Sequence, residues 1–164
     1  MAKSDIVARD IMNKNVIAAK KQALGRSLAE KLLTGKYSGM PVVDENNKIV
    51  GVISEFDLLK AMDHGKPLEK ITAQEIMSAK PICVSENTPV EDVIHIMTKH
   101  NIVRVPVVRD EIPVGIISRS DILKCVYGVR SPEFIRINSE KEKIEFFTEF
   151  KNVEFRSSEE VSNE

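Results

Sequence analysis

An internal repeat limits the possible folds of this chain more than any other feature of its sequence. The segment 50–60 aligns with the segment 114–124 at an offset of 64 residues, with seven identities in eleven positions. At an offset of 65, Met-Pro-Val-Val at 40–43 falls on Val-Pro-Val-Val at 105–108. Matches at a nearly constant spacing are the signature of duplicated structural units, so the sequence predicts two units of the same fold.

Each unit shows the same order of expected elements. Short apolar runs predict a first strand at Val16–Ala18 and again at Ile82–Val84. The helix that follows in the second unit is predicted to begin at Pro89 behind an N-cap at Thr88. In the first unit, residues 20–23 offer no comparable cap, so that helix is expected to begin differently.

Two strands and a helix complete each unit. Segments rich in β-branched residues predict hairpins at 40–43 with 48–53 and at 105–108 with 112–117. The closing helices are predicted to begin after Ser54 and Ser118. Their expected apolar faces consist of Leu58, Leu59 and Met62 in unit one, and of Ile122, Leu123 and Val126 in unit two.

This order predicts an α+β (mixed α/β) fold of two βαββα units at residues 7–63 and 72–127. One three-stranded sheet with two helices buries little apolar surface alone. Stacking the two units with approximate twofold symmetry buries both sheets and leaves two equivalent crevices between them. Residues 128–164 lie outside the repeat and form a separate extension.

Charge and cysteine content argue against several classes of function. The formal net charge is −1, which provides no general attraction for nucleic acid or an anionic membrane. Nowhere do about 18 apolar residues run together, and charges interrupt the first ten residues, so a soluble cytoplasmic protein is expected. Cys83 and Cys125 lack metal-ligand spacing, and no structural zinc is predicted.

The two segments Gly51-Val-Ile-Ser-Glu-Phe-Asp57 and Gly115-Ile-Ile-Ser-Arg-Ser-Asp121, with the Pro-Val-Val strands, resemble a tandem cystathionine β-synthase (CBS) domain pair, or Bateman module. The resemblance covers residues 7 to 127. It implies a regulatory module that binds an adenosine-containing ligand, such as AMP, ADP, ATP or S-adenosylmethionine, in the cleft between the repeats. It also implies a homodimer and an unknown protein partner, with no required cofactor.

The chemistry of these residues fits such a ligand. A carboxylate is an acceptor that can take both ribose hydroxyls, a role for Asp57 and Asp121. Ser54 and Ser118 combine a hydroxyl with backbone N–H groups at a helix start, which suits phosphate, and the preceding glycines are expected to allow close backbone approach. Residues expected beside the adenine are Ile17, Ala18, Ile82 and Cys83, together with the turns before the Pro-Val-Val strands.

A purely structural interpretation exists for the same residues. Ser-x-x-Asp at a helix start is also a capping box, in which the carboxylate accepts from the serine backbone N–H. Thr72-x-x-Glu75 is expected to be such a box. Recurrence of the serine and aspartate at equivalent places in both units favours a binding role, and a ligand-free structural or oligomerisation module is the alternative.

The two predicted sites differ in charge. Glu55 follows Ser54 and repels phosphate, whereas Arg119 follows Ser118 and suits it. Arg104, which aligns with Gly39, is a second candidate phosphate contact; it could equally be an ordinary exposed arginine. The hypothesis is that the Ser118 and Asp121 site binds a phosphate-bearing ligand more tightly.

The extension at 128–164 is acidic, with nine acidic and five basic residues from 131 onward. Its isoleucine and phenylalanine content predicts an amphipathic helix over 140–150, followed by a disordered end. This helix either covers the module's own surface or docks a partner. No catalytic motif occurs, so the chain is not expected to be an enzyme; related inosine monophosphate dehydrogenases need a separate large catalytic barrel.

Overall fold

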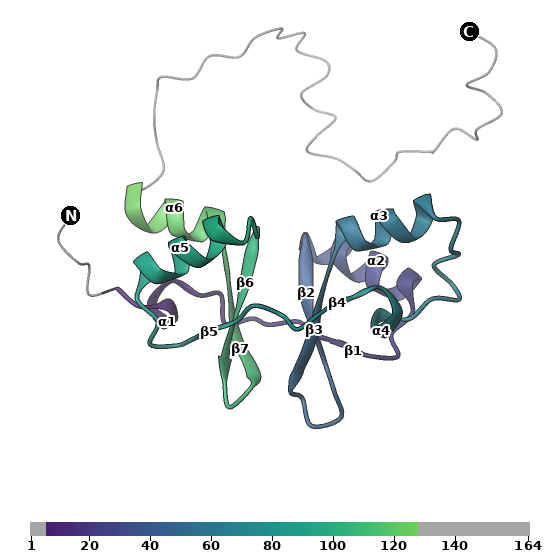
Figure 1. The fold of residues 1–164 in the computed structure, drawn as a ribbon, viewed down its shortest axis with the longest axis horizontal. Helices are drawn as coiled ribbons and strands as arrows, with labels where there is room; N and C mark the ends of the chain where they lie inside the picture. Colours follow the sequence, from purple (N-terminus) through teal and green to yellow (C-terminus); the bar gives the residue numbers. More distant parts are fainter. Residues whose placement is uncertain (1–5, 128–164) are drawn as a thin grey trace, which may run out of the picture. The chain divides into compact units, whose positions relative to one another are not determined.

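The computed structural model describes residues 6–127, which form two βαββα repeats with a short helix ahead of each (Figure 1). The first repeat and its preceding helix consist of α1 (Ala8–Ile11), β1 (Ala19–Lys20), α2 (Gly25–Gly35), β2 (Gly39–Val43), β3 (Ile49–Ser54) and α3 (Glu55–Asp63). The second set consists of α4 (Ala73–Ile76), β4 (Ser78–Ala79), β5 (Val84–Ser85), α5 (Val90–Lys99), β6 (Arg104–Arg109), β7 (Ile112–Ser118) and α6 (Arg119–Tyr127). The predicted α+β fold is confirmed.

The strands form two mixed sheets of equivalent topology. In one, β1 pairs parallel with β2, β2 pairs antiparallel with β3, and β4 adds antiparallel to β3. In the other, β5 pairs parallel with β6 and β6 pairs antiparallel with β7. Asn13 takes the place that corresponds to β4, because its backbone exchanges hydrogen bonds of 2.8 and 3.0 Å with Ile116 of β7.

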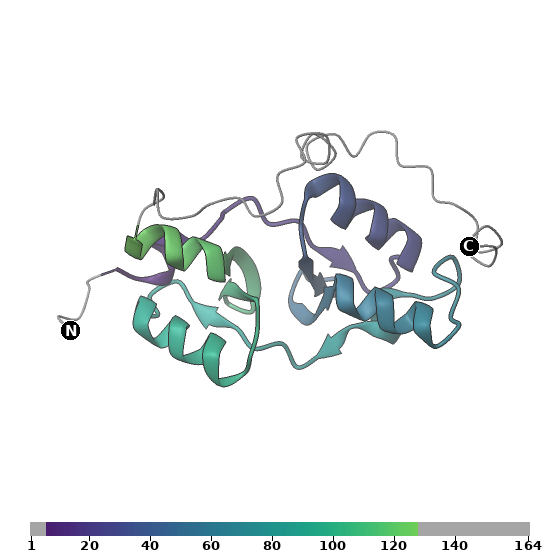
Figure 2. The same cartoon turned by 90° about the horizontal axis from the view of Figure 1, so that it is seen from above.

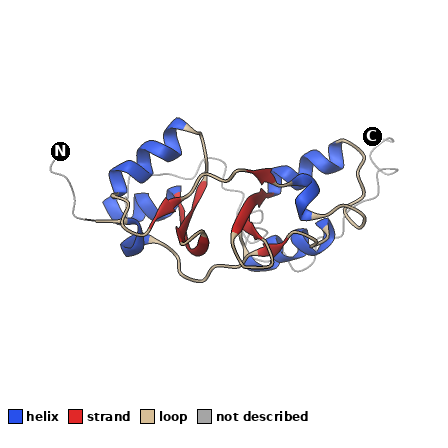
Figure 3. Cartoon of the chain, turned by 60° about the horizontal axis from the view of Figure 1, so that its bottom comes forward, coloured by secondary structure: helices blue, strands red, loops and turns tan. Residues whose placement is uncertain are grey.

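The sheets of the two repeats lie next to each other in the middle of the described residues, with the longer helices toward the outside (Figures 2 and 3). The hairpin ends of the two repeats are also joined. The Lys48 ammonium lies 2.6 Å from a carboxylate oxygen of Glu111, and the Ile49 N–H donates to the Glu111 carbonyl at 2.9 Å. These contacts fix one repeat against the other at the turns.

The short helices are exchanged between the repeats. Ala8 of α1 is fully buried in the core formed by β5, β6, β7, α5 and α6, and Ile11 and Met12 pack against the same core. Ala73 of α4 is fully buried in the core of the first repeat. Each repeat therefore completes its core with residues that precede the other repeat in sequence.

The exchange of the short helices explains why Gly51 and Gly115 precede the two serines. A Cβ at Gly115 would collide with the Sδ of Met12, and a Cβ at Gly51 would collide with the Sδ of Met77. The missing side chains make room for these methionines, which follow α1 and α4. This is the role the structure gives to glycines that we expected to let a ligand approach the backbone.

The first strand of each repeat is shifted from its predicted position. The prediction of strands at Val16–Ala18 and Ile82–Val84 is wrong in extent, since β1 begins at Ala19 and β5 at Val84. The parallel register pairs only two residues on each side, Ala19 and Lys20 with Val42 and Val43 in the first sheet. The apolar residues before them belong to the crossing segment that arrives from the other repeat.

Helix starts and faces also differ in part from the prediction. Helix α5 begins at Val90 with Pro89 as N-cap, because the Thr88 hydroxyl instead accepts from the Ser85 N–H at 3.0 Å. Helix α2 begins after Leu24 without a side-chain cap, as the absence of a capping residue predicted. Leu58 and Ile122 are buried as expected.

The other predicted apolar-face residues of the closing helices are exposed. Leu59, Met62, Leu123 and Val126 have exposed fractions of 47 to 59%. Each closing helix thus contributes a narrower face to its core than we predicted, because α1 or α4 covers only one side of it. The predicted extension at 128–164 lies outside the described residues, and within residues 6–127 no helix is long and apolar enough to cross a membrane.

Candidate functional site

Both Ser-x-x-Asp segments form complete capping boxes at the starts of the closing helices. The Ser54 N–H and hydroxyl donate to Oδ2 of Asp57 at 2.8 and 2.7 Å, and the Asp57 N–H donates to Ser54 Oγ at 3.3 Å. In the second repeat, Ser118 and Asp121 make the same three bonds at 2.8, 2.6 and 3.3 Å. The structural role considered from the sequence is therefore present at both positions.

A capping box leaves part of each carboxylate available. A carboxylate oxygen has two lone pairs, so Oδ2 is saturated by the serine while Oδ1 can accept further donors. Oδ1 of Asp57 lies 3.3 Å from the Lys60 ammonium, which also lies 5.1 Å from the centroid of the Phe56 ring. Within residues 6–127, Oδ1 of Asp121 has no hydrogen-bond or ion-pair partner, so it is the freer acceptor for a ribose.

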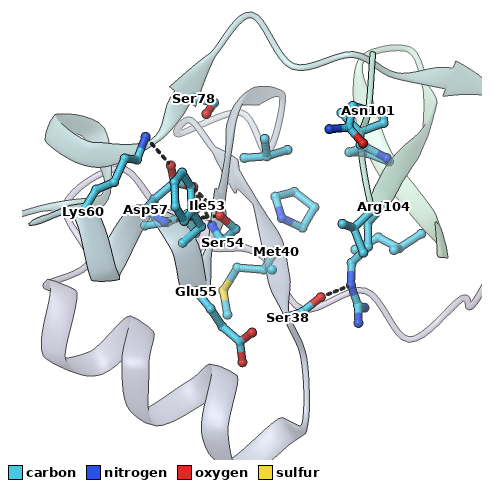
Figure 4. Close-up of a pocket in the computed structure, with 18 residues that line it drawn as sticks. Ser38, Met40, Ile53, Ser54, Glu55, Asp57, Lys60, Ser78, Asn101 and Arg104 are labelled. Carbon is cyan, nitrogen blue, oxygen red and sulfur yellow. Dashed lines mark hydrogen bonds and ion pairs between the residues drawn. The ribbon is translucent and has the colours of Figure 1, made fainter. Parts of the chain in front are cut away.

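Each capping box opens onto a cavity between the repeats. The cavity beside Asp57 measures about 640 Å³ and the cavity beside Asp121 about 290 Å³. Pockets for small molecules in proteins usually occupy roughly 300–1,000 Å³, so the first has ample room and the second is just below that range. Figure 4 shows the first cavity, with Ser54, Asp57 and Lys60 on one wall and Asn101 and Arg104 on the other.

Residues that the internal repeat aligns with each other occupy the linings of the two cavities. Ser78 and Asn101 line the Asp57 cavity, and their aligned counterparts Asn13 and Lys36 line the Asp121 cavity. The remaining surfaces differ. The larger cavity is mainly apolar, with the buried Met40 and Ile53 among its walls, while the smaller one is lined by more polar side chains.

Arg104 lines both cavities, and so does its aligned partner Gly39. Arg104 is directly opposite Ser118 in the register of β6 and β7, and Gly39 is opposite Ser54 in that of β2 and β3. The Arg104 Nε donates to the Ser38 hydroxyl at 2.6 Å, as Figure 4 shows. The half-buried guanidinium is therefore positioned between the repeats rather than on an exposed sheet edge.

Arg119 is held in another place. Its Nε donates to the Ile102 carbonyl at 3.0 Å, and its Nη2 donates to the Asn101 side-chain oxygen at 3.1 Å. It is not among the described residues that line either cavity. Glu55 does line the Asp57 cavity, where Figure 4 shows its carboxylate pointing away from Ser54 and Asp57.

Of the residues predicted beside adenine, the structure places Ile17 in the lining of the Asp121 cavity, next to Lys36 and Tyr37 of the turn before β2. Ala18, Ile82 and Cys83 are outside the linings of the two cavities within the described residues. Burial raises the pKa of the half-buried Cys83 thiol, and its Sγ lies 3.6 Å from the Pro81 carbonyl oxygen. Its placement agrees with an inert packing residue.

Several lining residues escaped prediction from the sequence. Ser38, Lys36, Tyr37, Asn101 and Asn13 belong to turns and crossing segments, where no hydrophobic period marks them. The internal alignment offers the signal that could have found them, since residues next to the aligned Gly39 and Arg104 border both crevices. Within residues 6–127, no group of three or more His, Cys, Asp or Glu side chains could hold a metal ion.

Comparison with protein families agrees with this geometry. The family model described as CBS domain matches residues 8–64 and 73–128. The chain is 35% identical over 123 residues to L-aspartate semialdehyde sulfurtransferase of Methanocaldococcus jannaschii, an alignment that covers 74% of this chain. The chain spans only 23% of that relative's length, and 32% and 41% of two further curated relatives.

Two solved structures are similar over nearly their whole length. A CBS domain pair crystallised in complex with 5′-methylthioadenosine and S-adenosyl-L-methionine has a TM-score of 0.69 and 34% identity, with 74% of this chain and 96% of that chain covered. CBSX2 in complex with AMP, a protein from Arabidopsis thaliana, has a TM-score of 0.65 and 26% identity, with 73% and 94% covered.

Proposed function

The chain belongs to the CBS-domain family as a tandem pair, and on that premise we propose that it is a regulatory module that binds an adenosine-containing ligand between its repeats. The observation that carries the proposal is the pair of corresponding cavities, each with a Ser-x-x-Asp capping box at its wall. Similar CBS pairs bind 5′-methylthioadenosine, S-adenosylmethionine and AMP, which supports this ligand class.

The ligand would use the atoms that the capping boxes leave available. Its ribose hydroxyls would donate to Oδ1 of Asp57 or Asp121, since Oδ2 is occupied by the serine. A phosphate would accept from Arg104, because each serine hydroxyl already donates its proton to the aspartate of its own capping box. The Asp121 cavity is the better phosphate site, because Lys36 adds a second cation there to the shared Arg104, while Glu55 borders the other cavity.

We assign Arg119 no direct phosphate contact in this arrangement, since its guanidinium is already bonded to Asn101 and Ile102. Arg119 would instead hold the turn that precedes β6, the strand on which Arg104 lies. Ala18, Ile82 and Cys83 remain proposed neighbours of the adenine, with Ile17 the one that lines a cavity here.

The effect of the ligand would be regulatory rather than catalytic, acting on an unknown protein partner in the cytoplasm. A homodimer is part of the proposal. Large apolar side chains on the outer helices are exposed, and a homodimer interface would remove such side chains from water. They include Leu33 at 74% and Phe56 at 66% exposed, with Leu59, Met62, Leu123 and Val126.

Isothermal titration calorimetry tests the proposal. AMP, ADP, ATP, S-adenosylmethionine and NADH would be titrated into the wild-type protein and into Asp57→Asn and Asp121→Asn, which keep the side-chain shape but remove the charge. We expect micromolar binding of at least one adenosyl ligand, about −8 kcal/mol, and its loss in one variant. No heat with any ligand would leave the ligand-free structural or oligomerisation module as the function.

A further inference from the structure

We propose that Arg104 is a single phosphate-binding side chain shared by the two cavities, so that a phosphate-bearing ligand in one cavity weakens phosphate binding in the other. The inference rests on the proposed function, because it assigns a ligand preference to the same two cavities. It goes further in predicting that they are coupled, and that this coupling depends on the ligand's phosphate rather than on its adenosine.

The position of Arg104 between the cavities is the first step. Its side chain lines both of them, and its backbone is opposite Ser118 in the sheet register. Only its Nε is engaged within residues 6–127, by the Ser38 hydroxyl at 2.6 Å. The two terminal nitrogens have no partner there and remain free to donate to an anion on either side.

The internal symmetry does not supply a second arginine. The equivalent position is Gly39, and a Cβ there would lie 2.9 Å from the carbonyl oxygen of Ile53. Real Cβ atoms essentially never approach a backbone atom that closely, so a side chain at Gly39 would require the strand pair to separate. The aligned positions 39 and 104 therefore provide one guanidinium, that of Arg104, between the cavities.

Other cations cannot replace it equally in the two cavities. Lys60 lines the Asp57 cavity, but its ammonium is paired with Asp57 and lies over the Phe56 ring. Lys36 lines the Asp121 cavity, and within residues 6–127 its ammonium has no such partner. A phosphate beside Asp57 thus depends on Arg104, whereas a phosphate beside Asp121 has two cations available.

Charge then gives the sign of the coupling. A phosphate monoester carries about −1.5 to −2 at pH 7, and the shared guanidinium carries +1. Two phosphates would compete for the two terminal nitrogens of this one guanidinium, so the second phosphate gains less from Arg104 than the first. A first phosphate-bearing ligand would occupy the Asp121 cavity, which leaves the Asp57 cavity to an adenosyl ligand without phosphate.

The test compares AMP with adenosine by calorimetry in the wild type and in Asp57→Asn, Asp121→Asn and Arg104→Gln. The two aspartate variants report the affinity of each cavity alone. We expect the second AMP to bind the wild type at least about tenfold more weakly than AMP binds the Asp57 cavity of Asp121→Asn, within the roughly 5–150-fold range of coupled sites. Adenosine should show no such difference.

In Arg104→Gln, AMP binding should weaken while adenosine binding stays unchanged, and the AMP coupling should disappear. Arg109→Gln is the matched control: Arg109 lies on the same strand, pairs with Glu86 and does not line either cavity, so the coupling should remain.

Three results would refute the coupling between the cavities but leave the proposed function in place, provided that adenosine binds. These are a wild-type AMP isotherm equal to the sum of the single-cavity isotherms, coupling that persists in Arg104→Gln, and an Asp121→Asn protein that binds adenosine but not AMP. If neither adenosine nor any nucleotide binds, the proposed function itself fails.

Discussion

Replacing Asp57 with alanine should destabilise the ligand-free protein, because its carboxylate is a buried structural acceptor as well as a proposed ribose contact. The side chain is 6% exposed and accepts two hydrogen bonds from Ser54 through Oδ2. Asp57→Ala leaves the Ser54 N–H at the start of α3 without its partner. It also removes the Lys60 ion pair at 3.3 Å.

The expected magnitude follows from these contacts. Hydrogen bonds to a charged group contribute about 1.5–3 kcal/mol, and a partly exposed i,i+3 ion pair adds at most about 0.5 kcal/mol. Ser54 donates two such bonds, so the total loss is about 3 kcal/mol at the lower end of this range. Unfolding entropy is about 2.1 cal/mol/K per residue, or about 0.25 kcal/mol/K for the two repeats, so the midpoint temperature should fall by about 12 °C. Asp121→Ala should cost about 2 kcal/mol, because Asp121 is only half-buried and has no ion pair within residues 6–127.

Thermal unfolding followed by circular dichroism, with urea titration at 25 °C, measures both changes. Asp63→Ala is the control, since this aspartate lies on the same helix, is exposed and should change stability by less than about 0.5 kcal/mol. An Asp57→Ala protein that melts within about 2 °C of the wild type would refute the argument that the capping box stabilises the fold.

The remaining predictions concern packing, acid stability and thiol reactivity. Gly115→Ala should destabilise by about 1–3 kcal/mol through overpacking against Met12, and urea titration of a double-mutant cycle should show a smaller penalty in a Met12→Ala background; an unchanged penalty would contradict the contact. Backbone and side-chain hydrogen bonds at the N-cap of α4 lower the pKa of Glu75, so its stabilising contribution is present above the unfolded pKa of about 4.3 and is lost as the pH falls through the lower folded value. In Glu75→Gln, the free energy of unfolding measured by urea titration should accordingly fall less steeply between about pH 5 and 3 than in the wild type. An identical slope in the two proteins would show that this carboxylate does not contribute to the acid sensitivity. The exposed Cys125 should react with a thiol reagent before the half-buried Cys83, whose pKa is raised by burial, as peptide mass spectrometry can verify; equal rates would contradict the assigned burial.

The repeat made most of the fold predictable, because aligned copies constrain each other. The hairpins at β2–β3 and β6–β7 and the N-caps at Ser54 and Ser118 follow from β-branched runs and capping residues, which are local signals. The shifted start of β1 was not predictable in this way. The residues at 16–18 are apolar because they cross between repeats, and periodicity does not distinguish a crossing segment from a strand.

The candidate site was predictable where its residues stand in repeated positions. Asp57 and Asp121 line corresponding cavities, as the duplicated motif led us to expect. The place of Arg119 was not foreseen, since its bonds to Ile102 and Asn101 depend on how α6 meets the turn before β6. The importance of Arg104 became clear only from the stacking of the two sheets, which brings one strand start beside two cavities.

The exchange of α1 and α4 has a mechanical consequence. The first core is continuous in sequence from Ala19 to Ala79, whereas the second needs residues near Ala8 together with those from Val84 onward. Both ends of the described chain therefore emerge from the same core, the one that carries Asp121. A pull or displacement applied at either end reaches that core first, and reaches the Asp57 cavity only through the contacts between the repeats.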